Sequence, residues 1–179
     1  NLPLMVWYGI EPLVRADLQR FVGWMDAAKI PLIRRHIARR ASEPDVRAGG
    51  LPALVKRIAA TTNNEIRWEM LAGILDGLKG VRSIAMPAGW TELSPALRSS
   101  SHPGVASRAL ELALVFDDPA ALLALRQQAA DPDAPAESRV RAIDALVSRR
   151  PPDLAPLLLK LTAEPATRRS AVRALAEYD

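Results

Sequence analysis

The residues of this sequence best suited to chemistry are arginines, which recur just ahead of the same apolar position in a repeated helical phrase. A row of guanidinium groups could line a concave basic groove that binds an acidic partner or a phosphate chain. The same arginines could instead form a structural ladder by bonding to acids and carbonyls of neighbouring turns. The mixed charge and the scarcity of aromatic side chains for base stacking favour the ladder. Both interpretations concern Arg34, Arg35, Arg67, Arg108, Arg139, Arg141, Arg168 and Arg169, and the groove would be centred on Arg67, Arg108, Arg141 and Arg168.

A second candidate is a basic cluster in residues 29–40, which contain no acidic residue. On a helix, Arg35 and Arg39 share one side and repel each other mildly unless an acid lies opposite. Upstream, Trp7 and Tyr8 are adjacent, so one narrow helical stripe cannot bury both rings. Aromatic anchors beside arginines are typical of interface hot spots, although a solvated helix face is the simpler alternative. The expected docking surface for a preceding domain comprises Trp7, Tyr8, Glu11, Arg34, Arg35, Arg39 and Arg40.

Other kinds of site have little support in the sequence. The absence of cysteine excludes disulfides, thiolate zinc sites and cysteine nucleophiles. The two histidines, His36 and His102, are far apart in sequence, and we expect them to be a packing residue and a turn residue. No pair of acids is placed for general acid and base catalysis. We therefore expect this chain to contain no catalytic residue, no cofactor-binding residue and no metal site.

The elements that position these residues are predicted from a repeated apolar anchor. Ile37, Met70, Leu110, Ile143 and Val172 occupy the same place in successive copies, at steps of 33, 40, 33 and 29 residues. A period of about 30–40 residues is typical of helix pairs that bury their apolar faces only by stacking. The sequence therefore predicts an all-α fold, an α-solenoid of about five HEAT-like antiparallel helix pairs in a right-handed superhelix. We expect one domain over residues 1–179, with repeats at 1–42, 43–80, 88–116, 117–150 and 151–179.

Breaks in this pattern are expected at two places. Pro12 should break or kink the opening apolar run, because proline cannot continue a helix. Residues 79–89 are irregular and account for the longer 40-residue step, so a protruding loop is expected there. The chain also starts without methionine and ends without a polar capping helix. We therefore expect a fragment of a longer protein.

Charge and hydropathy limit the expected partners. The net charge of +4 comes from an excess of basic residues within positions 1–60, whereas a nucleic-acid-binding solenoid should be basic along its whole length. The longest apolar runs are far below the length of a membrane span. We therefore expect no membrane insertion and no binding to duplex nucleic acid at physiological ionic strength. Neighbouring domains or another protein are the expected partners, and the oligomeric state is not predicted.

The opening of the chain also carries a family resemblance. It contains NLPLMVWYGIEPLV and then, from residue 29, KIPLIRRHIARR. Over roughly residues 1–41 it resembles the helical-repeat segment of large planctomycete and verrucomicrobial membrane-bound dehydrogenases with a haem-binding CxxCH domain. In that family a sugar-dehydrogenase-like β-propeller precedes HEAT-like repeats, and a c-type cytochrome domain follows. Because this chain has no cysteine and no propeller-like strands, none of the family's catalytic or haem-binding residues maps onto it.

Two functional hypotheses follow. The resemblance implies a non-catalytic scaffold or docking module within a bacterial dehydrogenase, periplasmic or associated with the cell envelope, with c-type haem in another domain. The alternative is a free-standing α-solenoid that binds nucleic acid or an acidic protein partner through a basic groove. An enzyme with its active site in the groove is a third possibility, for which the sequence offers no set of residues.

Overall fold

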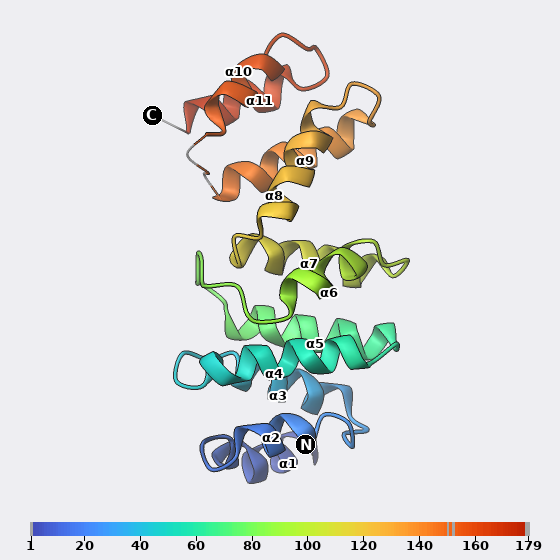
Figure 1. Cartoon of the computed structure of the whole chain (residues 1–179), viewed down its shortest axis with the longest axis vertical. Helices are drawn as coiled ribbons and strands as arrows, with labels where there is room; N and C mark the ends of the chain where they lie inside the picture. The colour runs from blue at the N-terminus through green and yellow to red at the C-terminus, as the bar shows by residue number, and fades with distance from the viewer. Residues whose placement is uncertain (1, 150, 152, 178–179) are drawn as a thin grey trace. The chain divides into compact units, whose positions relative to one another are not determined.

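The computed structural model describes residues 2–149, 151 and 153–177, and these residues form helices and connecting loops without a β-strand (Figure 1). The prediction of an all-α helical-repeat fold is therefore confirmed. The chain divides into two compact units, Asn1–Asp117 and Asp118–Asp179, and the division falls where the fourth repeat was predicted to begin. The predictions of a single domain and of a right-handed superhelix stay predictions.

The first unit has two layers of helices. Helices α2, α4 and α6 form one layer and α3, α5 and α7 the other, and each helix also packs on its partner from the other layer. Helix α1 packs against α3. The bounds are α1 Leu2–Ile10, the 3-10 helix η1 Glu11–Arg15, α2 Leu18–Gly23, α3 Pro31–Ala41, α4 Arg47–Ala60, α5 Asn64–Gly77, α6 Trp90–Arg98 and α7 Pro103–Val115.

The second unit contains two helix pairs. Helix α8 packs on α9 and α10 on α11, and the pairs stack through α8 with α10 and α9 with α11. Each pair is joined by a short connection, as expected for antiparallel neighbours. The bounds are α8 Pro119–Ala130, α9 Ala136–Arg149, α10 Ala155–Leu161 and α11 Arg168–Ala176.

Helix starts follow from capping residues that the sequence displays. The side chains of Asp17, Asn63 and Asp118 accept hydrogen bonds from amides in the first turns of α2, α5 and α8. His102 caps α7, because its Nδ1 accepts from the amide of Val105 at 3.3 Å. Proline is the first residue of α3, α7 and α8, where its missing N–H loses no helical partner.

The two predicted breaks lie where the sequence placed them. Helix α1 ends at Ile10, and Pro12 lies within η1, so the opening run is divided as expected. The segment 79–89 is irregular, but it is not wholly a protruding loop. The amide of Ile84 donates to the carbonyl of Val115 at 3.0 Å, and Pro87 is buried. The middle of the segment therefore lies against the end of α7, to which it is hydrogen-bonded.

The predicted anchors differ in burial. Ile37, Met70 and Ile143 are buried, and Leu110 is half-buried. Val172 is 54% exposed, so its assignment as a buried anchor is wrong. Helix α11 instead buries small residues, Ala171 and Ala174, because short side chains fit a helix that lies close to its neighbours. The β-branched residue of this segment was therefore a poor guide to its buried stripe.

Helix α5 packs closely on α3. A Cβ atom at Gly73 would lie 2.4 Å from the carbonyl oxygen of Arg35, and one at Gly77 would lie 2.4 Å from that of Arg39. The neighbouring side chains of α3 are the short ones of Ala38 and Ser42. These glycines, one turn apart, form a flat stripe that lets the two backbones meet.

We predict that Gly73→Ala and Gly77→Ala each lower the free energy of unfolding by about 1–3 kcal/mol or more, because α5 must move away from α3. Urea unfolding followed by circular dichroism measures the change. Gly9→Ala is the matched control, since a Cβ there meets no atom within 4 Å and alanine favours the helix. If the three variants are equally stable, the glycine stripe does not set the spacing of α3 and α5.

Candidate functional site

Helix α1 is apolar on all sides, which is unusual for a helix at a surface. None of its nine residues is charged. Met5 and Tyr8 are 72% and 71% exposed, and Val6 is also exposed. A helix that is hydrophobic all round is normally buried in a larger structure. We call the exposed side chains of Met5, Val6 and Tyr8, together with the hollow beside them, the α1 face.

The adjacent aromatic residues of α1 take different positions. Trp7 is half-buried, and its ring lies 6.2 Å from that of Phe21 and 5.1 Å from that of His36. Tyr8 is exposed. One ring of the pair is thus half-buried against other rings and the other is exposed, which agrees with the expectation that one stripe cannot bury both.

A hollow of about 370 Å³ opens between α1 and α3. It brings together five of the seven predicted interface residues, and Arg34 and Arg35 are not among its lining. The wall also includes His36, which the sequence predicts to be a packing residue. The complete lining is Leu4, Trp7, Tyr8, Glu11, His36, Arg39, Arg40 and Glu43.

The arginines of α3 are paired with acids that lie outside residues 29–40. Arg34 bonds to Glu69, and Arg35 donates to Asp76 at 2.6 Å. Both acids belong to α5, which stacks on α3. The expectation of a basic cluster without acids therefore has to be corrected. A local sequence window cannot count the carboxylates that the next repeat supplies.

Arg40 is the centre of a second set of ion pairs. It is buried, and it donates to Glu11 at 2.7 Å and to both carboxylate oxygens of Asp45 at 2.8 and 2.9 Å. The hydrogen bonds from Arg40, aided by Arg15, hold the pKa of Asp45 well below its usual range. Arg39 is exposed, 3.7 Å from Glu43. The charges beside the α1 face are therefore largely neutralised, and its exposed apolar area is what distinguishes it.

His36 contributes an unsatisfied polar atom to this region. Its Nε2 is buried and has no hydrogen-bond partner among the described residues. Burial lowers the pKa of His36, and the positive charges of Arg39 and Arg35 lower it further, against a smaller opposing effect of Asp76. The imidazole is thus held neutral beside Trp7.

The recurring arginines share a structural contact that the sequence does not specify. Arg34, Arg67 and Arg139 are each the fourth residue of their helix. Each reaches back to a main-chain carbonyl in or after the preceding helix, of Ala28, Ile58 and Ala129 respectively. Ile58 and Ala129 lie in the last turns of α4 and α8, whereas Ala28 lies in the loop after α2. The last carbonyls of a helix lack internal partners and carry partial negative charge, so the guanidinium groups of Arg67 and Arg139 are stabilising there.

The other arginines predicted to line a basic groove also contact neighbouring groups of the protein. Arg168 donates to the carbonyl of Thr162 at 2.9 Å. Arg108 lies over the ring of Trp68, 4.4 Å from its centroid, and Arg141 lies 3.6 Å from Glu137 on the same helix. These contacts support the structural ladder. Arg67 and Arg108 belong to the first unit, and Arg141 and Arg168 to the second.

The described residues offer no metal site and no membrane span. No three histidine, aspartate or glutamate side chains gather there as metal ligands would. Within the same residues, no helix combines the length and apolar character needed to cross a bilayer. The absence of bound cofactors from this chain remains a prediction.

Comparisons with protein-family models, with curated proteins and with solved structures each returned no match. The class of protein is therefore defined by the fold alone, as an all-α helical repeat. The resemblance over residues 1–41 has no independent support from these comparisons.

The ladder predicts unequal effects for two arginines on α9. Arg139 is buried and bonds to Ala129 and Glu164, so Arg139→Ala should lower the free energy of unfolding by about 1.5–3 kcal/mol. Arg141→Ala is the matched control and should change it by less than about 0.5 kcal/mol, since its pair with Glu137 is exposed. Thermal and urea unfolding measure both. Equal losses would contradict the structural role assigned to Arg139.

The neutral state of His36 predicts a pH dependence. Because its pKa is lowered in the fold, the unfolded chain binds the proton more readily once the pH falls below about 6.5. The wild type should therefore lose more free energy of unfolding between pH 7.5 and pH 5.5 than His36→Phe does. The variant keeps a ring against Trp7 and cannot titrate. Parallel curves for the two proteins would show that His36 is not held neutral.

Proposed function

We propose that this chain is a non-catalytic, HEAT-like scaffold module whose α1 face docks a neighbouring domain of a larger polypeptide. In the family that residues 1–41 resemble, the larger protein is a bacterial, cell-envelope dehydrogenase with a c-type haem domain. This chain has no cysteine to attach such a haem, so the proposal places the haem and the catalytic chemistry in other domains.

The observation that carries this proposal is the exposure of Met5, Val6 and Tyr8 on a helix without charged residues. Contiguous apolar surface of this kind marks a site of interaction in soluble proteins. The half-buried Trp7 and the unsatisfied Nε2 of His36 lie next to it. A docked domain would cover the apolar side chains and could supply a hydrogen-bond partner to the imidazole.

A basic groove for nucleic acid is the weaker proposal. It needs guanidinium groups that are free to neutralise phosphates. Arg67 and Arg168 instead donate to main-chain carbonyls, and Arg34, Arg35 and Arg40 are bound to carboxylates. A partner recognised through exposed apolar side chains fits these contacts better.

Oxidation of Met5 by hydrogen peroxide tests the docking proposal. In this chain alone the exposed Met5 should oxidise readily, and in the longer polypeptide its rate should fall about tenfold as the docked domain covers it. Met86, which is 36% exposed and lies outside the α1 face, is the internal control and should oxidise at the same rate in both. Peptide mass spectrometry measures both rates.

A variant of the longer polypeptide strengthens the test. Val6→Ser combined with Tyr8→Ser should restore rapid oxidation of Met5, whereas Leu123→Ser, an exposed apolar residue of α8, should leave it slow. Equal Met5 rates in the two proteins would refute docking through the α1 face. Protection that grows with the concentration of this chain alone would instead identify self-association.

A further inference from the structure

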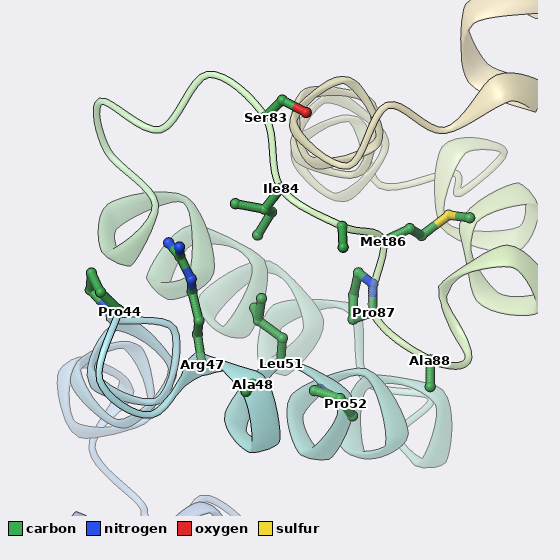
Figure 2. Close-up of a pocket in the computed structure, with 11 residues that line it drawn as sticks. Pro44, Arg47, Ala48, Leu51, Pro52, Ser83, Ile84, Met86, Pro87 and Ala88 are labelled. Carbon is green, nitrogen blue, oxygen red and sulfur yellow. The ribbon is translucent and has the colours of Figure 1, made fainter.

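The first unit contains a second and larger groove, on the side where α4 meets the segment 83–88. It encloses about 640 Å³, within the range of about 300–1,000 Å³ typical of ligand sites. Figure 2 shows its two walls: Arg47, Ala48, Leu51 and Pro52 come from the first turns of α4, and the irregular segment passes opposite them. None of its lining residues belongs to the α1 face.

The wall formed by residues 83–88 is held in place at several points. The amide of Ile84 donates to Val115 at 3.0 Å, and the hydroxyl of Ser83 bonds to Asp117. At the other end Pro87 is buried, and its carbonyl accepts from the amide of Trp90 at 3.2 Å. The groove is therefore formed before any ligand arrives.

The lining combines apolar side chains with the polar side chains of Arg47 and Ser83 and with main-chain groups. Leu51, Ile84 and Pro87 supply aliphatic surface, and Arg47 is the one charged side chain among the described lining residues. In Figure 2 its guanidinium group extends from α4 into the space between Pro44 and Ile84. No carboxylate within the described ranges forms an ion pair with Arg47, in contrast to the paired Arg40. The groove thus presents a cation beside apolar walls.

The backbone of the irregular segment adds a second recognition element. Residues 81–87 have no regular secondary structure, and the amides of Ala85 and Met86 take part in none of the backbone hydrogen bonds between described residues. On the opposite wall, Pro52 lacks an N–H, so the carbonyl of Ala48 has no partner at the usual helical position. Main-chain groups of this kind can pair with an added extended peptide.

From the charge and the free main-chain groups together, we infer that this groove binds an extended peptide that carries a carboxylate next to apolar side chains. The carboxylate pairs with Arg47, the apolar side chains contact Leu51 and Pro87, and the peptide backbone pairs with residues 85–86. We call this site the α4 groove. It is separate from the α1 face, so either proposal can fail without the other.

The probe is a fluorescein-labelled, C-terminally amidated peptide Leu-Val-Glu-Leu-Pro, compared with the same peptide carrying glutamine in place of glutamate. Fluorescence anisotropy measures affinity, and amide chemical shifts locate the site. With the wild-type chain, the glutamate peptide should bind about five- to tenfold more tightly, because only it forms the charge-assisted bond. Its binding should shift the amides of residues 47–51 and 84–86.

Variants assign the preference to one side chain. Arg47→Gln should remove the difference between the two peptides, and Arg47→Lys should keep part of it. Lys56→Gln, which removes the same charge from an exposed position on α4, is the matched control and should keep the full preference. The comparison of peptides on the wild type does not depend on how well any variant folds.

Several results would overturn the inference. These are equal binding of both peptides, a preference that survives Arg47→Gln, or shifts confined to α1. Butyrate is a further probe, since it offers a carboxylate and an apolar chain without a peptide backbone. If butyrate shifts the same amides with equal affinity, the groove is a site for small apolar acids and not for peptides.

Discussion

The close contact between α3 and α5 is the constraint on which the first unit depends. Gly73 and Gly77 let the backbone of α5 approach the carbonyl oxygens of α3, and Ala38 and Ser42 leave room for it. At this spacing the arginines on either side of the stripe reach acids of α5, as Arg35 reaches Asp76. Two helices held further apart could not form these pairs directly. Packing and ion pairing in this unit are thus consequences of the same small residues.

The arginine ladder supplies hydrogen-bond donors to main-chain carbonyls that short helices leave without partners. Each helix leaves its last carbonyls without internal partners, and a chain of many short helices has many such ends. Here a guanidinium group from the next helix reaches back to such a carbonyl at two joints, through Arg67 and Arg139, and Arg34 reaches the loop carbonyl of Ala28. Arg34 and Arg139 also bond to an acid of the following pair, Glu69 and Glu164. One residue type therefore stabilises a joint within a pair and the stacking between pairs.

Local features of the fold could be predicted from the sequence because their causes are local. Caps and first-turn prolines set the helix starts, and Pro12 divides the opening run. The partners of the arginines could not be predicted, because they come from carbonyls and from acids a full repeat away. The exposed Val172 shows the same limit, since small residues such as Ala171 form the buried stripe where helices pack closely.

Of the candidate site, the sequence indicated the aromatic pair on α1 and its neighbours. The exposure of Met5 and Val6 was not predicted. The lack of charged residues in α1 could have indicated an apolar surface there. The α4 groove was not predictable, because it depends on the path of the irregular segment 83–88. That path is fixed by a contact of Ile84 with the far end of α7.

The acids that pair with Arg34 and Arg139 come later in the sequence, which has a consequence for synthesis of the chain on the ribosome. The acid that neutralises Arg34 follows it by 35 residues, and the one that neutralises Arg139 follows by 25. At about 5–20 residues per second, Glu69 is made roughly 2–7 s after Arg34. Until then the guanidinium group of the nascent pair has no carboxylate from the next repeat. At these two joints the ion pair is therefore completed only after the next helix pair has been synthesised.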